Sequence, residues 1–134
     1  MSDHQVRDLN LLAKEALSAL ADGGNPLFPL IDGRILSVQA TPEQGTSSDM
    51  ALGVAVMPAG YSTPQHSHRA EEIAIILRGT GVISIDGEPV DVTEGSVVLT
   101  PPHLPHVTTA SADGPLVIFW VYAPAGSETR WLAK

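Results

Sequence analysis

The sequence of 134 residues contains no cysteine, and its only lysines are Lys14 and Lys134. Without thiols the chain cannot form disulfides or iron–sulfur clusters, and any metal ion must be held by imidazole, carboxylate or carbonyl groups. Seven Lys and Arg stand against 15 Asp and Glu, which gives a formal net charge of −8. Because nucleic acids and anionic membranes are bound through clustered basic residues, we predict neither as a partner.

Long hydrophobic runs are also absent. No stretch approaches the ~20 apolar residues that cross a bilayer, and no apolar core of signal-peptide type follows the polar segment Met1–Arg7. We therefore expect a cytoplasmic protein. Hydrophobic residues nevertheless make up 43% of the chain, which is enough to bury a core and excludes wholesale disorder. The length fits one domain.

The first 24 residues are predicted to form a helical arm. Apolar residues recur at spacings of three and four between Asp3 and Ala21, which is the period of an amphipathic helix. Ser2 or Asp3 could cap its start, and Gly23-Gly24 would end it. Since an isolated helix of this length is marginal in water, we expect its apolar stripe to dock on the rest of the domain or on a second subunit.

Residues 25–134 are predicted to form a single all-β domain. Short apolar runs alternate with turn residues, which favours a sandwich or barrel. The dipeptide Asp86-Gly87 between two such runs predicts a two-residue hairpin. The predicted strands are Ile35–Ala40, Ala51–Met57, Glu72–Arg78, Gly81–Asp86, Pro89–Val92, Ser96–Thr100, Val107–Ala110 and Pro115–Tyr122.

Histidines and a glutamate form a candidate metal site. In a strand, residues two apart share a face about 6.6 Å apart, so His66 and His68 can converge on one ion. Glu72 opens the next apolar run, where an unpaired charge would be costly, and His106 could supply a fourth ligand. Without a metal, the same histidines could be hydrogen-bonded residues inside a barrel, and Glu72 could form a salt bridge to Arg78.

The spacing of these residues resembles that of the cupin superfamily. The first cupin motif is matched at each defining position by Gly60-x5-His66-x-His68-x3-Glu72-x6-Gly79. The second is matched by Gly95-x5-Pro101-x-His103-x2-His106, except that His103 stands where the family usually has Gly, and Ala110 where an Asn is common. The segment between the motifs, residues 80–94, is as short as in small single-domain bacterial cupins.

The resemblance implies a fold, a cofactor and an assembly. The expected fold is all-β, a double-stranded β-helix barrel of jelly-roll type over residues 25–134, preceded by an N-terminal α-helix within residues 1–24. The expected cofactor is one divalent metal ion, Fe, Mn, Ni or Zn, and the expected assembly is a homodimer. The implied metal ligands are His66, His68, Glu72 and His106.

Two further residues are candidates for catalysis. His103 lies in a proline-rich turn, so it could be a surface turn residue, a hydrogen-bonding neighbour of the metal ligands, or a general acid–base group, since imidazole suits proton transfer near neutral pH. Tyr61 follows Gly60 and could line a substrate pocket. Arg69 and Arg78 flank the first motif and could bind a substrate carboxylate through a planar fork of donors.

The last strand carries most of the aromatic residues. Its side chains alternate between two faces, with one set formed by Ile118, Trp120 and Tyr122 and the other by Val117, Phe119 and Val121. We expect one set to line the barrel interior and the other to serve sheet packing or a dimer surface. The sequence does not indicate which is which.

These features favour a small metal-dependent enzyme. The expected small-molecule substrate is rich in oxygen, such as a keto, enol, diol or carboxylate compound, which a metal ion can activate as a Lewis acid. With Fe(II) the enzyme would be a dioxygenase, whereas Zn, Mn or Ni would suit an isomerase, cyclase or lyase. The alternative is a non-catalytic module that binds a small molecule, because the fold alone does not determine the reaction.

Overall fold

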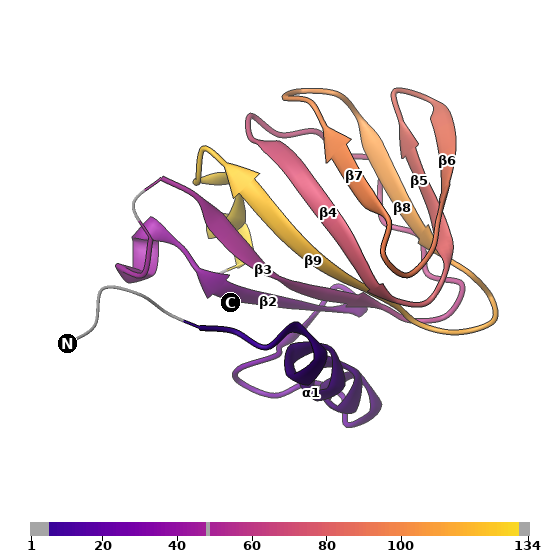
Figure 1. Ribbon diagram of the computed structural model, residues 1–134, viewed down its shortest axis with the longest axis horizontal. Coiled ribbons are helices and arrows are strands. Elements are labelled where there is room, and N and C mark those ends of the chain that lie inside the picture. Colours follow the sequence, from indigo (N-terminus) through magenta and orange to yellow (C-terminus); the bar gives the residue numbers. More distant parts are fainter. Residues whose placement is uncertain (1–5, 48, 132–134) are drawn as a thin grey trace.

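The computed structural model describes residues 6–47 and 49–131, in which two antiparallel sheets enclose a core (Figure 1). In spatial order, the six-stranded sheet contains β1 (Leu30–Ile31), β2 (Arg34–Ala40), β3 (Ala51–Met57), β9 (Leu116–Ala123), β4 (Glu71–Arg78) and β7 (Val97–Thr100). The three-stranded sheet contains β6 (Glu88–Val92), β5 (Gly81–Ile85) and β8 (His106–Ala110). The predicted all-β jelly roll is confirmed.

Each predicted strand is present, with ends that differ by no more than one residue. The two-residue strand β1 was not predicted, because Leu30–Ile31 is too short to show alternation. Two 3-10 helices, Pro42–Gln44 and Ser127–Trp131, interrupt segments between and after the strands. The hairpin between β5 and β6 turns at Asp86 and Gly87, both with positive φ of 49° and 83°, as a two-residue turn of the mirror-image type requires.

The helix α1 spans Leu9–Ala21 and begins later than predicted. Asp8 is extended and its side chain accepts a hydrogen bond from the amide of Leu11 at 3.1 Å, so this residue caps the helix. Residues 6–8 are therefore not helical, while the predicted caps Ser2 and Asp3 lie outside the described residues. No helix in the described ranges is both long and apolar enough to cross a membrane.

The helix covers part of the outer face of the six-stranded sheet (Figure 1). Its buried side chains are Leu12, Ala13, Ala16 and Ala19. They pack on outward-facing residues of four neighbouring strands, namely Ile35, Val54, Val56, Leu77 and Val117. Of the two dockings predicted for the apolar stripe, the one on the same domain is thus observed. The boundary between the helical arm and the barrel at residue 24 stays a prediction.

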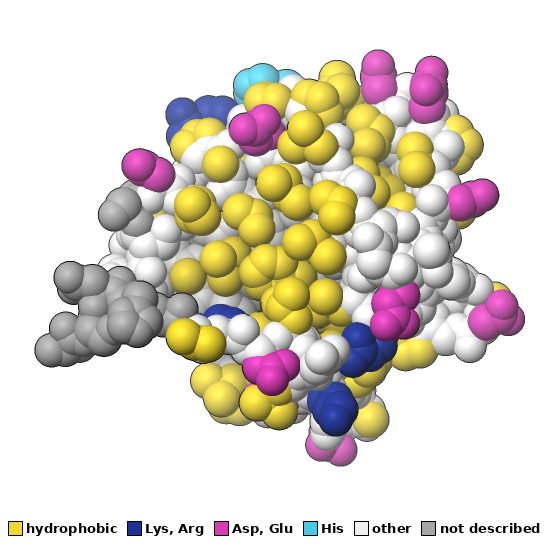
Figure 2. All heavy atoms as spheres, viewed as in Figure 1, with side chains coloured by type: hydrophobic (Ala, Val, Ile, Leu, Met, Phe, Trp, Pro, Cys, Tyr) yellow, Lys and Arg dark blue, Asp and Glu magenta, His cyan; other side chains and the backbone are white. Residues whose placement is uncertain are grey.

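Beyond the helix, the same outer face carries an apolar patch. Figure 2 shows apolar side chains gathered over β4, β7 and β9. We define the outer apolar patch as Ile73, Ile75, Val97, Leu99, Phe119 and Val121, which lie side by side because Ile73 pairs with Leu99 and Val121, and Ile75 with Val97 and Phe119. Val97 and Leu99 are 64% and 58% exposed. Apolar exposure this concentrated is typical of a surface that binds another protein.

The opposite face of the sheet points into the barrel. Its buried core includes Leu36 of β2, Ile76 of β4 and Ile118 of β9, together with Ile83 from the three-stranded sheet. Because strand residues alternate between faces, the neighbours of the outer patch point inward. The inner face is therefore the one that can line a site between the sheets.

Candidate metal centre

Three imidazoles from two separate segments come together at one end of the barrel. His66 and His68 lie in the segment between β3 and β4, and His106 begins β8. An isolated antiparallel bridge joins the segments, with the amide of His106 donating to the carbonyl of His66 at 2.8 Å and the reverse bond at 3.2 Å. One ring nitrogen from each histidine lies within 4.8 Å of the others.

His66 and His68 do not form the strand pair from which their convergence was predicted. Their segment forms two isolated bridges, Ser62 with Thr109 and His66 with His106, and His68 is in neither a strand nor a bridge. The strand assumed for His66 and His68 is therefore not observed, although their rings do converge. The rings meet because the bridge to His106 and local hydrogen bonds hold the loop in place.

Each of the three imidazoles is anchored through its Nδ1 atom by a backbone carbonyl. His66 Nδ1 lies 2.9 Å from the oxygen of Pro64, and His68 Nδ1 lies 2.8 Å from that of Ala70. His106 Nδ1 lies 3.0 Å from the oxygen of Leu104. Since a carbonyl only accepts, each Nδ1 donates the proton, which leaves Nε2 of the neutral ring as the lone-pair atom that can bind a metal.

Glu72 completes the cluster from the start of β4. Its Oε1 lies 3.1 Å from His68 Nε2 and 3.6 Å from His106 Nε2, and its side chain is 16% exposed. Burial alone would raise the pKa of Glu72, but hydrogen bonds and charge interactions with His106 and His68 outweigh it and lower the pKa from 4.5 to about 2. The carboxylate is thus ionised at neutral pH.

The donor set fits a divalent cation. With the protons on Nδ1, the Nε2 of His68 and the Oε1 of Glu72 are both acceptors, yet they lie 3.1 Å apart. Two acceptors at this distance repel each other unless a cation, either a proton or a metal ion, lies between them. Three imidazoles and one carboxylate suit Fe, Mn, Ni or Zn, so His66, His68, Glu72 and His106 could hold such an ion.

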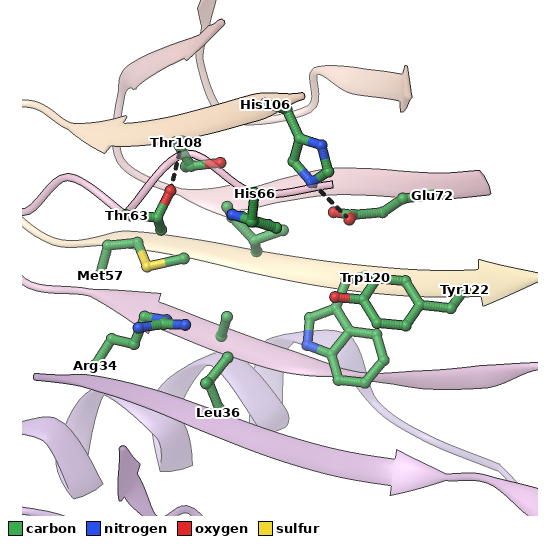
Figure 3. Close-up of a pocket in the computed structure, with 12 residues that line it drawn as sticks. Arg34, Leu36, Met57, Thr63, His66, Glu72, His106, Thr108, Trp120 and Tyr122 are labelled. Atoms are coloured by element: carbon green, nitrogen blue, oxygen red, sulfur yellow. Dashed lines mark hydrogen bonds and ion pairs between the residues drawn. The ribbon is translucent and has the colours of Figure 1, made fainter. Parts of the chain in front are cut away.

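A small pocket lies beside this cluster between the two sheets (Figure 3). The polar lining includes His66, Glu72 and His106, with Thr63 and Thr108 nearby. Apolar lining comes from Leu36, Ala55, Met57 and Ile118.

The aromatic residues that face the pocket are Trp120 and Tyr122 of β9. The ring of Tyr122 lies 4.8 Å from that of His68, and 4.7 Å from that of Trp120. Figure 3 shows the Tyr122 hydroxyl directed into the pocket. Of the two predicted faces of the last strand, the one with Ile118, Trp120 and Tyr122 is therefore the inner face.

The two residues predicted to be catalytic do not line this pocket. His103 is exposed in the loop before β8 with a positive φ of 66°, and its amide donates to the carbonyl of His68 at 2.8 Å. The Tyr61 hydroxyl donates to the carbonyl of Asp32 at 2.8 Å and accepts from Nη1 of Arg34 at 2.8 Å. The catalytic roles of His103 and Tyr61 stay predictions.

Glu72 does not form the salt bridge to Arg78 that the sequence left open. A register shift between Ile76 and Arg78 breaks the strand alternation that would have placed the two side chains on one face. Nη1 of Arg78 instead lies 3.8 Å from Glu94. Arg69 is exposed, and neither it nor Arg78 lines the pocket.

A cupin-domain model matches residues 53–122, which is more than half of the chain and includes all four residues of the cluster. The chain belongs to the cupin family. Its fold agrees with that of a cupin protein from Bacteroides fragilis, which is 29% identical with a TM-score of 0.59 over 68% of this chain and 79% of the other.

Two relatives of this cupin are lyases by name. The dimethylsulfoniopropionate lyase DddW of Ruegeria pomeroyi is 30% identical over 71% of this chain and 60% of its own length. The structure of the lyase DddQ from the same organism is 34% identical with a TM-score of 0.55, over 62% of this chain and 42% of its own. This cupin therefore spans less than two thirds of either lyase. An uncharacterised protein of Methanocaldococcus jannaschii is 33% identical over 65% of this chain and 70% of its own.

One pocket residue escaped prediction altogether. Arg34 opens β2, is 7% exposed, and lines the pocket of this cupin on the side opposite Glu72 (Figure 3). A signal was available, because Arg34 shares strand parity with Leu36 and Val38, which belong to or pack against the core. A single charge in line with core residues points inward, as Glu72 does.

Proposed function

We propose that this cupin is a metal-dependent lyase that acts on a small carboxylic acid. The observation that carries the proposal is the pair of acceptors, His68 Nε2 and Glu72 Oε1, held 3.1 Å apart in a cluster of imidazoles whose Nδ1 protons are committed to backbone carbonyls. Such a cluster is arranged for a shared cation next to a pocket between the two sheets.

The proposed metal ligands are His66, His68, Glu72 and His106, and the proposed ion is Fe, Mn, Ni or Zn. When bound, the ion supplies Lewis-acid stabilisation of negative charge that develops on a substrate oxygen. The carbonyls of Pro64, Ala70 and Leu104 hold the rings in the orientation that this requires.

A lyase reaction is supported by the names of the relatives DddW and DddQ. For a carboxylic acid with a leaving group on C3, a base removes a proton from C2, the bond from C3 to the leaving group breaks, and its electrons depart with that group. A double bond forms between C2 and C3, so no oxidant or reductant is needed. We assign the base to Tyr122, whose oxygen would take the C2 proton as the phenolate and become the hydroxyl, because this oxygen is directed into the pocket beside His68.

Other roles predicted from the sequence remain part of the proposal. A dioxygenase would use the same ligand set with iron and would consume oxygen, which a lyase does not. General acid–base catalysis by His103 and a pocket role for Tyr61 are tested by measuring the turnover of variants at these two positions. A cytoplasmic location stays a prediction from the sequence alone.

We further propose a homodimer joined through the outer apolar patch. Val97, Leu99 and Ile73 are 64%, 58% and 38% exposed on adjacent strands. The patch contains no charged side chain, and its self-association would remove this apolar surface from water.

The first experiment measures metal content. Protein purified without chelator is expected to contain a divalent ion, and the His66→Ala/His68→Ala variant is expected to lack it. His103→Asn is the matched control, because it removes an exposed imidazole while Asn tolerates the positive φ at that position. Equal metal content in the double variant and the wild type would remove the proposed centre.

The second experiment tests turnover. Anaerobically loaded protein is supplied with 3-substituted propionates, including dimethylsulfoniopropionate, and the release of an α,β-unsaturated acid is followed. Tyr122→Phe is expected to lower kcat by about 100-fold or more, since positioned proton transfer contributes about this much. Product formation only with oxygen uptake would replace the lyase with a dioxygenase, and no conversion with any ion would leave a binding module.

A further inference from the structure

One buried hydrogen-bond donor in the pocket has no partner. Trp120 is 4% exposed, and its Nε1 is buried without a hydrogen-bond partner in the structure. Leaving a buried N–H unsatisfied costs free energy, so such a group in a native protein calls for an explanation. A metal ion does not supply one, because an indole N–H only donates and cannot bind a cation.

The neighbours of this N–H on the inner face are apolar. Figure 3 shows the indole nitrogen on the edge of the ring that is turned toward Leu36. The strand register places Ala55 beside Leu36, and Ile118 beside Ala55. These three side chains line the pocket together with Trp120 and carry no hydrogen-bond acceptor. The acceptor that Nε1 needs therefore has to enter the pocket.

The position of the indole ring follows from the packing around it. Gly53 of β3 pairs with Trp120, and a Cβ atom at Gly53 would lie 2.4 Å from the indole Cζ2 and 2.8 Å from Cε2, the atom bonded to Nε1. Glycine at this position thus makes room for the ring. Along β9, the ring of Tyr122 lies against the indole, with the two centroids 4.7 Å apart. The direction of Nε1 is therefore set before any ligand enters.

The size of the cavity limits what can reach this donor. Its volume is about 50 Å³. Since one water molecule needs roughly 10–15 Å³ of such space, the cavity takes about four non-hydrogen atoms. A carboxylate with its adjacent carbon has this number of atoms and brings the acceptor oxygens that an N–H requires. Ordered water would also fill the space, so an experiment has to separate the two.

We infer that Trp120 selects the substrate in two ways: its Nε1 donates to a carboxylate oxygen, and its ring restricts the cavity to a carboxylate and an unbranched C2. This inference deepens the proposed function and rests on it for the class of substrate, a small carboxylic acid. It brings C2 close to Tyr122, the proposed base, whose ring flanks the indole. Trp120 itself transfers no proton, because its N–H is a donor only.

The test observes the indole N–H by nuclear magnetic resonance. Uniformly ¹⁵N-labelled wild-type protein is titrated with acetate, with propionate and with 2,2-dimethylpropionate, once with chelator and once after metal loading. The Trp131→Phe variant assigns the Trp120 signal, since these are the two tryptophans of the chain. Acetate and propionate are expected to shift the Trp120 signal downfield, as a new hydrogen bond does. 2,2-Dimethylpropionate is expected to leave it in place, because its methyl groups exceed the cavity.

Variants separate the donor from the bulk of the ring, with affinity followed through backbone amide signals. Trp120→Phe keeps an aromatic ring without the donor and is expected to weaken acetate binding by about 10-fold or more, the usual effect of losing a hydrogen bond to a charged group. Trp120→Leu also enlarges the cavity and is expected to admit 2,2-dimethylpropionate. Phe119→Leu is the matched control, because Phe119 is the adjacent aromatic residue of β9 and does not line the pocket.

The outcomes separate this inference from the proposed function. A Trp120 signal that no acid moves in either condition would mean that water alone satisfies Nε1, and would overturn the inference. Equal acetate affinity in Trp120→Phe and the wild type, or 2,2-dimethylpropionate bound by the wild type as tightly as acetate, would overturn it as well. A shift with acetate in protein that retains no metal after loading would uphold the subsite and refute the metal centre, whereas bound metal without a shift would do the reverse. The shift is read in the wild type, so a misfolded variant does not affect it.

Discussion

The two faces of the six-stranded sheet carry different chemistry, although the same strands supply both. On the inner face, Glu72 pairs with Thr100 on β7 and with Tyr122 on β9. One residue along each strand, on the outer face, Ile73 pairs with Leu99 and Val121. Strand alternation thus separates the candidate site from the apolar surface by a single residue. Substitutions on one face should therefore leave the property of the other unchanged.

The faces also differ in how they contribute to stability. The inner face holds Arg34 and Glu72, and His106 faces it from β8 of the other sheet. Buried polar groups of this kind contribute little unless they are fully paired. The outer face under α1 is apolar, and its burial stabilises the fold without requiring paired hydrogen-bonding partners. We infer that the helix and the outer face add stability to a barrel whose apolar interior also holds polar groups.

The largest effect is expected from removing a proposed metal ligand between the sheets. His106→Ala should lower affinity for the divalent ion by more than about 100-fold, because even the loss of a residue that only orients a ligand costs 10- to 100-fold. Competition with a chromogenic chelator measures the affinity. The outer-face variant Leu99→Lys is the control and should bind metal as the wild type does. A matching loss in Leu99→Lys would show that the faces are not independent.

The next effect concerns acid stability of the inner face. The pKa of Glu72 is lowered from 4.5 to about 2 by folding, so its ionised form stabilises the folded protein above about pH 4.5, and this contribution is lost as the pH falls toward 2. In chelator-treated protein the difference in unfolding free energy between wild type and Glu72→Gln should shrink by roughly 3 kcal/mol between pH 5 and pH 2. Urea titrations measure it, and a difference that is constant with pH would contradict the assignment.

On the outer face, the helix should contribute to stability alone. Leu12 lies on the buried side of α1 and is 8% exposed. Leu12→Ala should lower the free energy of unfolding by about 2 kcal/mol, near the low end for buried leucines, because part of the side chain reaches solvent. Metal content should not change. Leu11→Ala, at a position 53% exposed, is the matched control with an effect within about 0.5 kcal/mol. Loss of metal in Leu12→Ala would show that α1 also supports the inner face.

The sequence allowed prediction of the cluster of histidines and Glu72 because its members lie in compact motifs. His66, His68 and Glu72 fall within seven consecutive positions, and His106 follows a recognisable turn. The strand geometry assumed for His66 and His68 was nevertheless wrong, since the bridge to His106 positions them. That contact joins segments about forty residues apart, and no local pattern encodes it.

The opposite end of the pocket could not be predicted in the same way. Arg34 of β2 and Trp120 of β9 line one pocket because β2, β3 and β9 pair in that order. The register sets Trp120 opposite Gly53 and Val38, four residues along β2 from Arg34. Alternation assigned Trp120 and Tyr122 to a common face, but it could not tell inside from outside until the position of α1 was known. The helix is what distinguishes the two faces of an otherwise apolar sheet.

The smallest effect on the folded protomer is expected at the outer apolar patch. Leu99 is 58% exposed, so Leu99→Lys should change the unfolding free energy of the protomer by no more than about 0.5 kcal/mol. It would nevertheless place a charge in the proposed dimer interface, where burial of an unpaired charge is costly. Sedimentation should show a dimer for the wild type and a monomer for Leu99→Lys, with the exposed variant Met50→Lys, on the loop before β3 and away from the patch, remaining a dimer. A wild-type monomer, or an unchanged dimer in Leu99→Lys, would assign the patch no role in self-association and would leave its apolar exposure to be explained by another partner.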